Sequence, residues 1–273
     1  GDVTDGNTCP EIITRTYQIS DANGNTATCD QTITVNDITP PTASDPAPIS
    51  VECLSGVPAP DVSVVTDEAD NCTVSPVVAF VGDVSDGNTC PELITRTYSV
   101  TDDCGNSITV DQTITVNDIT NPTMTAPSDI SVECLSDVPA AYANYVQWTA
   151  AGGTASDNCG INTASFTMVN ESSDGNTCPE LITRIYQIED NCGNIGTVAQ
   201  SITVNDITPP SLTSPAPLSF ECDSDVDAPY VSLPAFELAG GTAVDNCGVD
   251  ASSFTWIGDV SDGNTCPETI TRT

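Results

Sequence analysis

The chain has 273 residues, of which 39 are acidic, 4 are basic and none is His, so its formal net charge is −35 at pH 7. This charge excludes nucleic acid as a partner, because phosphate recognition depends on Lys and Arg. The absence of His and Lys removes the commonest general base and the Schiff-base nucleophile, so we expect a protein that is not an enzyme and has no catalytic residues. No apolar run is long enough to span a membrane, and we expect no membrane insertion by this segment.

The sequence repeats itself along its whole length. The motif DGNTCPE begins at Asp5, Asp86, Asp174 and Asp262, with spacings of 81, 88 and 88 residues. Two further motifs, VNDIT and (V/F)EC, recur with the same period, which establishes a repeat unit of 81–88 residues. The longer unit gains its extra residues only between the motifs, as expected for insertions in loops.

Each unit is best bounded at the IT(P/N)P sequence, because Pro cannot donate a hydrogen bond to a sheet and stiffens a linker. Two of the resulting units are partial, so we expect this chain to be a window from a longer array. The four expected segments are Gly1–Asp37 (C-terminal part of a unit), Ile38–Asp118 and Ile119–Asp206 (complete units) and Ile207–Thr273 (N-terminal part of a unit).

Alternating apolar and polar residues predict β-strands. In the second unit these are Ile49–Cys53, which follows several Pro residues as an edge strand does, then Leu93–Thr101 and Ser107–Asn117. In the third unit we expect further strands at Val146–Thr149 and Ser165–Val169. No segment shows a helical period. The pattern therefore predicts an all-β fold of tandem immunoglobulin-like β-sandwich repeats that form an elongated, disulfide-stapled rod.

The second unit carries the motifs PPT, VEC, DNC, TRTYSVTDDCGN and ITVND in that order. This series resembles the HYR-like (hyalin repeat) module, and the resemblance extends over the whole chain. It implies an immunoglobulin-like fold and a tandem array in a very large bacterial cell-surface protein, such as the gliding-motility adhesins of Bacteroidota. The family pattern has a Cys early in the last strand, which here is only Cys29; in later units Cys104 and Cys192 stand in the preceding turn.

Four cysteines in a complete unit allow three pairings, and sandwich topology selects one. The DNC and DxCGN motifs fall in loops at one end of an immunoglobulin-like sandwich, and the VEC and GNTC motifs at the other. We therefore expect bonds inside each unit: Cys72–Cys104, Cys159–Cys192, Cys53–Cys90, Cys134–Cys178 and Cys222–Cys266. Cys9, Cys29 and Cys247 are expected to have no partner. Disulfides would place the protein outside the cytoplasm, and the lack of CxxC and His argues against zinc.

Each unit has one Arg at the same place, and these residues are Arg15, Arg96, Arg184 and Arg272. Arg96 shares a strand face with Ile94 and Tyr98, so we expect a structural residue whose guanidinium pairs with an acid. Glu52 of the VEC motif is one candidate partner. The alternative is a residue that binds carboxylates or sugars.

Asp and Asn gather in the loops, and Ca²⁺ takes about 6–8 oxygen ligands from such residues. At the junctions of units, Asp37 is expected near Asp70, Asp102 and Asp103. Asp118 is expected near Asp157, Asn158 and Asp190, and Asp206 occupies the same position in the following unit. Folding of a unit would require no cofactor, because disulfides already close it. The alternative is turn chemistry and a solvated acidic surface.

These features favour a structural stalk segment of a very large secreted adhesin, which spaces a distal adhesive tip from the cell in gliding or surface attachment. Its partners would be neighbouring repeats of the same chain, and its location the extracellular cell surface. Two alternatives stay open. One is an array of modules that bind carbohydrate or Ca²⁺, with surface polysaccharide as a partner. The other is a subunit of a self-assembling extracellular filament, with identical chains as partners.

Overall fold

The computed structural model describes all residues from 1 to 273, and the chain forms two compact units. The first consists of Gly1–Thr123, Ala155–Thr163 and Ile188–Gly196, and the second of Met124–Thr154, Ala164–Gln187 and Thr197–Thr273. These units do not follow the four sequence repeats. Two segments of the third repeat fall in the first unit, and each contains a cysteine, Cys159 or Cys192, that is bonded to the second repeat.

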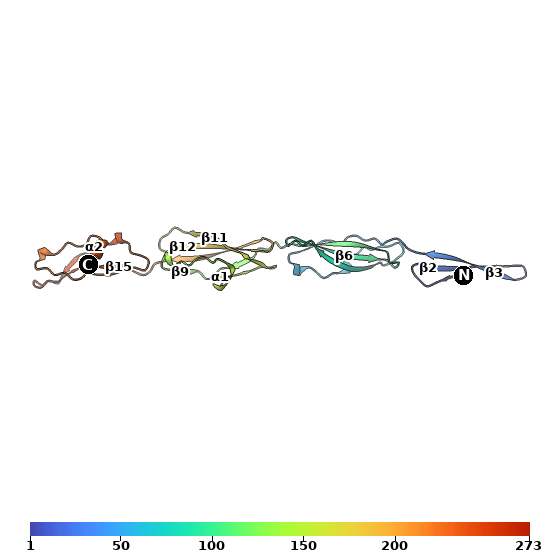
Figure 1. The fold of residues 1–273 in the computed structure, drawn as a ribbon, viewed down its shortest axis with the longest axis horizontal. Coiled ribbons are helices and arrows are strands. Elements are labelled where there is room, and N and C mark those ends of the chain that lie inside the picture. The colour runs from blue at the N-terminus through green and yellow to red at the C-terminus, as the bar shows by residue number, and fades with distance from the viewer. The chain divides into compact units, whose positions relative to one another are not determined.

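Strands dominate the first two repeats (Figure 1). The partial first repeat contains β1 (Asp2–Thr4), β2 (Glu11–Ser20) and β3 (Thr26–Val35), which form an antiparallel sheet in that order. The second repeat contains β4 (Ile49–Val51), β5 (Val77–Ser85), β6 (Glu92–Thr101) and β7 (Ser107–Val116). Its sheet has the order β4-β7-β6-β5, in which only the β4–β7 pair is parallel.

The third repeat contains a sheet of the same order, β11-β12-β13-β9, in which β9 is parallel to β13. Its elements are β8 (Thr123–Thr125), β9 (Ile130–Val132), α1 (Tyr145–Ala150), β10 (Thr154–Ser156), β11 (Ile161–Ser173), β12 (Glu180–Asp190) and β13 (Ile195–Val204). The partial fourth repeat contains β14 (Ser211–Thr213), α2 (Leu233–Leu238), β15 (Thr242–Val244), β16 (Asp259–Ser261) and β17 (Ile270–Arg272). Short 3₁₀ turns lie at Leu54–Gly56, Val62–Val64, Leu135–Asp137, Asp223–Asp225 and Ala251–Ser253.

The predicted all-β fold is confirmed, and four of the five predicted strands correspond to β4, β6, β7 and part of β11. The strand predicted at Val146–Thr149 is wrong, because this segment lies in helix α1. Asn144 caps that helix by accepting a hydrogen bond from the backbone N–H of Gln147 at 3.0 Å. Trp148 anchors it, since its side chain is fully buried against Phe166 and Tyr186.

The two complete repeats bury the same residues at the same register. In the second repeat, Ile94, Ile114 and Val116 form a core against Ile49 and Val51. In the third repeat, the equivalent cluster consists of Ile182, Ile202 and Val204, packed against Ile130 and Val132. The offsets between them equal the sequence period, so the repeat of the sequence is a repeat of the core.

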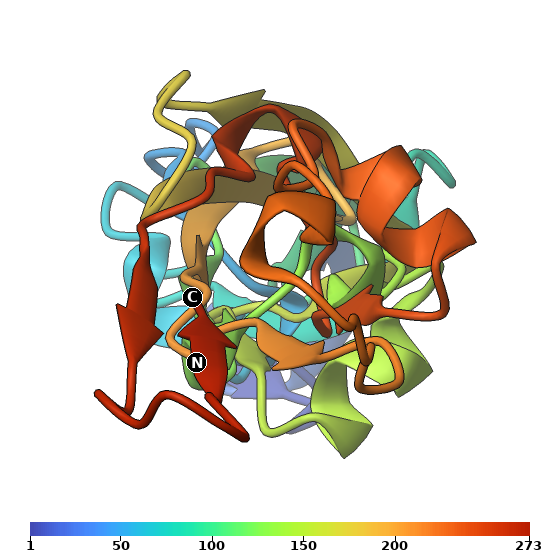
Figure 2. The same cartoon turned by 90° about the vertical axis from the view of Figure 1, so that its left-hand side faces the viewer.

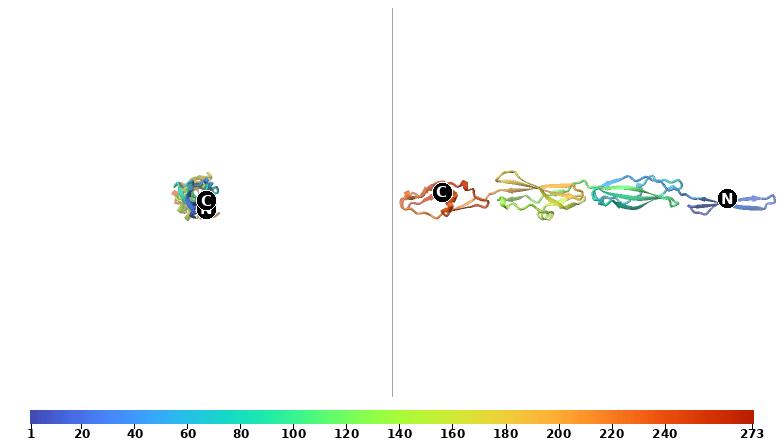
Figure 3. Two further views of the ribbon diagram at one scale, coloured as in Figure 1. Left: turned by 90° about the vertical axis from the view of Figure 1, so that its right-hand side faces the viewer. Right: turned by 45° about the horizontal axis from the view of Figure 1, so that its top comes forward.

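The β2–β3 hairpin lacks the burial that the equivalent strand of the second repeat has. Tyr98 and Val100 on β6 are fully buried, whereas their counterparts Tyr17 and Ile19 on β2 are 50% and 74% exposed. Figure 3 shows the β2–β3 hairpin, in blue, without a second layer over it. At the other end of the chain, Figure 2 shows the orange-to-red C-terminal part, where β16 and β17 pair antiparallel. No helix of the chain is long and apolar enough to cross a membrane.

Candidate functional site

Four disulfides join consecutive repeats, and each lies within one compact unit. Two connect the GNTCPE motif of one repeat to the turn before the last strand of the next, and two connect a VEC motif to the DNC motif of the next. The pairs are, in that order, Cys9–Cys104, Cys90–Cys192, Cys53–Cys159 and Cys134–Cys247. Such bonds persist only under oxidising conditions, which places this chain outside the cytoplasm.

The predicted bonds within units are wrong. Cys53 and Cys90 do not bond to each other, because both bond into the third repeat. Because both bonds lead to the third repeat, they agree with the expectation that the VEC and GNTC motifs lie at the same end of a repeat. The other predicted pairs are also absent, namely Cys72–Cys104, Cys159–Cys192, Cys134–Cys178 and Cys222–Cys266. Cys9 and Cys247, which were expected to be unpaired, are bonded.

Five cysteines are free and exposed, and these are Cys29, Cys72, Cys178, Cys222 and Cys266. Cys29 lies in β3 and was predicted to have no partner. The other four occupy motif positions that form bonds in other repeats. Cys178 and Cys266 stand in GNTCPE motifs, Cys72 in a DNC motif and Cys222 in the FEC motif.

Hydrogen bonds accompany the disulfides at two junctions. Beside Cys53–Cys159, Glu52 Oε2 accepts from Asn158 Nδ2 at 2.6 Å and from Thr120 Oγ1 at 3.0 Å. Beside Cys134–Cys247, Glu133 accepts in the same way, and its donors are Asn246 at 2.6 Å and Thr208 at 2.8 Å. Glu52 therefore holds the following repeat, and the suggestion that it pairs with Arg96 is wrong.

Each Arg forms an ion pair with the acid thirteen residues before it. The partners are Arg15–Asp2, Arg96–Asp83, Arg184–Glu171 and Arg272–Asp259. The Arg96 side chain is only 3% exposed, and it also donates to the carbonyl oxygen of Pro58 at 2.9 Å. Its guanidinium lowers the pKa of Asp83, chiefly through their hydrogen bonds. Each of the four guanidinium groups is thus paired with an acid of its own repeat.

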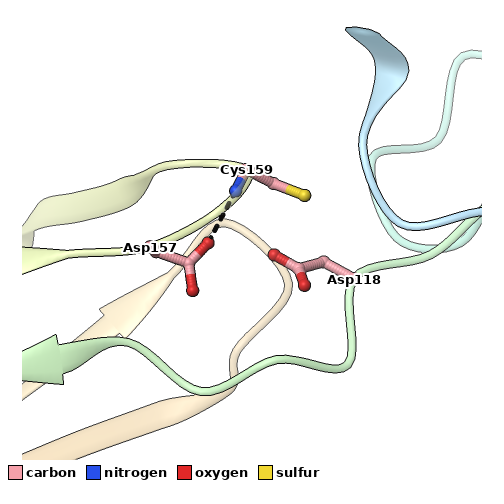
Figure 4. A group of neighbouring side chains, drawn as sticks. All are labelled: Asp118, Asp157 and Cys159. Carbon is pink, nitrogen blue, oxygen red and sulfur yellow. Dashed lines mark hydrogen bonds between the residues drawn. The ribbon is translucent and has the colours of Figure 1, made fainter. Parts of the chain in front are cut away.

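The predicted acidic residues meet at three places. Ligand atoms within 4.8 Å of one another form the groups Asp37–Asp70–Asp102, Asp118–Asp157–Cys159 and Asp206–Asp245–Cys247. Figure 4 shows the second group, in which the carboxylates of Asp118 and Asp157 turn toward each other. Cys159 and Cys247 contribute disulfide sulfur rather than thiolate, so the chemically competent ligands in all three groups are oxygens.

Two of the predicted acids lie outside these groups. Asp103 is exposed, and its backbone N–H donates to Thr73 Oγ1 at 3.0 Å. Asp190 is buried, and its carboxylate accepts from Cys192 N–H and from the backbone and side chain of Asn194. Burial alone would raise the pKa of Asp190, but these hydrogen bonds outweigh it and lower the pKa.

Asn194 also links this turn to the end of the preceding repeat, because its Nδ2 donates to the carbonyl oxygen of Asp118 at 3.0 Å. Asn106 makes the same contact with the carbonyl oxygen of Asp37 at 3.2 Å. The Asn of the DxxGN turn thus fixes the backbone that presents the junction aspartate. The DxCGN motif predicts this turn, but no feature of the sequence alone indicates the contact that its Asn makes.

Residues 41–116 match the family model described as "HYR-like domain with 4 cysteines", which confirms the resemblance for the second repeat. Among solved structures, the chain is similar to Drosophila N-cadherin EC1-4, with 11% sequence identity and a TM-score of 0.30. That alignment covers 73% of this chain and 59% of the cadherin chain, so it spans less than two thirds of the cadherin's length. No curated protein sequence matches the chain.

Proposed function

We propose that this chain is a non-enzymatic segment of the stalk of a secreted surface adhesin, and that it spaces a distal adhesive tip from the cell during attachment or gliding. The observation that carries the proposal is the bonding of each repeat to the next by disulfides. A disulfide inside a repeat would stabilise only that repeat. A disulfide between repeats also limits how far the array extends when a repeat unfolds, because it shortens the covalent path that carries the tension.

The arrangement shortens the covalent path that bears a pulling force. From the N-terminus this path runs to Cys9, crosses to Cys104, follows the chain to Cys134 and crosses to Cys247. With about 3.4 Å per extended residue, the path measures about 230 Å, against about 930 Å for the fully extended chain of 273 residues. The oxidised protein would therefore resist overextension, as a load-bearing spacer requires.

The match of the second repeat to the HYR-like domain supports an adhesion-type extracellular module. The acidic composition supports it too, because a net charge of −35 keeps such a surface soluble and self-repelling. The partners under this proposal are neighbouring repeats of the same chain.

Single-molecule force spectroscopy on the chain, held at both termini, tests the proposal. The oxidised protein should stop extending near about 230 Å, and a reductant should release it toward about 930 Å. Bonds confined to single repeats would instead stop the extension near about 510 Å. That length, or no effect of the reductant, would contradict a load-bearing role. Light scattering on the same sample distinguishes single chains from a self-assembling filament.

A further inference from the structure

Two carboxylate oxygens at the junction of the second and third repeats have no hydrogen-bond partner. Asp118 is 4% exposed; its Oδ1 accepts from Thr120 N–H at 3.0 Å, and its buried Oδ2 accepts from nothing. Asp157 Oδ1 accepts from the N–H groups of Cys159 and Gly160 at 2.8 and 3.1 Å, and its Oδ2 is likewise buried and unpartnered. Oxygens of the two residues lie within 4.8 Å of each other (Figure 4).

The same arrangement occurs at the preceding junction, and half of it, at one aspartate of the pair, occurs at the following junction. Asp37 Oδ2 and Asp70 Oδ1 are buried without a partner, while the other oxygen of each accepts backbone N–H groups. At the third junction, Asp245 Oδ2 is buried without a partner and lies in a group with Asp206. One recurring geometry therefore leaves open carboxylate oxygens at three equivalent places.

No positive group of the chain compensates these carboxylates. There is no Lys or His, and all four Arg residues are paired with acids elsewhere. Two like charges that face each other away from water repel strongly, and a buried unpaired charge is costly. A cation from the solvent would remove both costs.

We propose that each of the three aspartate pairs binds one Ca²⁺ ion. Every available ligand is a hard oxygen, and the neighbouring sulfurs are held in disulfides, which disfavours zinc and copper. Ca²⁺ accepts irregular geometry and completes its shell with water, whereas Mg²⁺ demands a near-ideal octahedron. With few protein ligands, each site should have an affinity of about 10⁻⁴–10⁻³ M, the range of extracellular modules.

The inferred ion has a specific place in the architecture. Asp118 ends one repeat, Asp157 belongs to a loop of the next, and the disulfide from Cys159 to Cys53 lies beside them. The bond holds the two repeats together, and the ion would relieve the repulsion between their acidic residues. This inference does not depend on the stalk proposal, because it concerns only binding.

Equilibrium dialysis of the full chain against Ca²⁺ in 0.15 M NaCl tests the inference, with Asp118→Asn as the variant. The Asn side-chain oxygen can still accept from Thr120, and the amide nitrogen can donate to Asp157, so the variant should fold. The wild type should bind three ions at millimolar Ca²⁺, and the variant two. Without Ca²⁺ the variant should melt at or above the wild-type temperature, and Ca²⁺ should stabilise it less than it stabilises the wild type.

Asp137→Asn is the matched control. Asp137 is an exposed residue of the third repeat, and its substitution removes the same single negative charge. It should still bind three ions. Equal loss of binding in both variants would show a diffuse ion atmosphere around an acidic chain and would overturn the site. Absence of any bound Ca²⁺ at 10 mM would also overturn it.

Discussion

Cys53 and Cys159 are bonded although 106 residues separate them, and their Cα atoms lie 5.2 Å apart. The residues that precede them are joined by a hydrogen bond, which Asn158 Nδ2 donates to Glu52 Oε2 at 2.6 Å. A covalent bond and a hydrogen bond thus join the same two loops of consecutive repeats. The equivalent pair Cys134–Cys247 repeats this relationship, with Asn246 donating to Glu133.

We expect Cys53→Ser to lower the free energy of unfolding by about 2–4 kcal/mol, because it opens a large loop of the unfolded chain. Urea unfolding followed by circular dichroism measures this change. Cys29→Ser is the control and should leave stability unchanged, since Cys29 is free and exposed. Equal stability of the two variants would mean that the bond does not constrain the chain.

The free cysteines give a second expectation. A maleimide added to the denatured but unreduced chain should label five residues, and these are Cys29, Cys72, Cys178, Cys222 and Cys266. The eight bonded cysteines should react only after reduction. Labelling sites are identified by mass spectrometry. Labelling of Cys9 or Cys247 without reduction would disagree with bonds between repeats.

The loss of stability on breaking an Arg–Asp ion pair should depend on how deeply the pair is buried. Asp83→Asn removes the charged partner of Arg96, whose side chain is 3% exposed, so we expect a loss of about 2 kcal/mol. The loss is below that of a fully buried pair because Asp83 itself is 34% exposed. Asp2→Asn breaks the equivalent pair with Arg15, where both side chains are about half exposed, and should have no measurable effect. Thermal and urea unfolding of both variants would show whether the difference exists.

Stability should fall in acid. The pKa values of Asp86 and Asp174 in the DGNTCPE motif are lowered, first of all by backbone hydrogen bonds from Asn88 and Asn176. A group whose pKa is lowered by folding stabilises the protein above its unfolded pKa, and that contribution is lost as the pH falls through the folded value. We expect constant unfolding free energy from neutral pH to about pH 4 and a decline below it.

Unfolding in urea at a series of pH values measures this decline. High salt in the buffer screens the net charge and separates the effect from the loss of repulsion near the pI of 4.1. A free energy that stays level or rises between pH 4 and pH 2 would contradict the expectation.

The sequence predicted the strands well because period 2 persists over ten-residue segments such as β6 and β7. It missed α1 because six residues with a single buried side chain, Trp148, show no helical period. It missed the partner of Arg96 for another reason. Asp83 lies thirteen residues earlier, on the paired strand β5, and only the strand register brings the two together.

The disulfide pairing could not be settled by the repeat itself. In a tandem array each motif recurs in every unit, so a bond from Cys53 to a DNC or GNTC motif satisfies the same pattern within one repeat or across two. The acidic groups were easier to predict. Loop positions at the repeat ends placed Asp37 near Asp70, and Asp118 near Asp157, as the structure has them. Asp190 lies apart because Cys192 and Asn194 hold its carboxylate.

Tryptic digestion without reduction tests the bonding of consecutive repeats most directly. Cleavage after the four Arg residues produces a peptide, Gly1–Arg15, whose single cysteine is Cys9. With free thiols blocked and the chain denatured, we expect Cys9–Cys104 to retain this peptide and the three other bonds to retain the remaining large fragments in one covalent species. Reduction should then release them all. Release of Gly1–Arg15 before reduction would contradict the account, because it would mean that the first repeat is not bonded to the second.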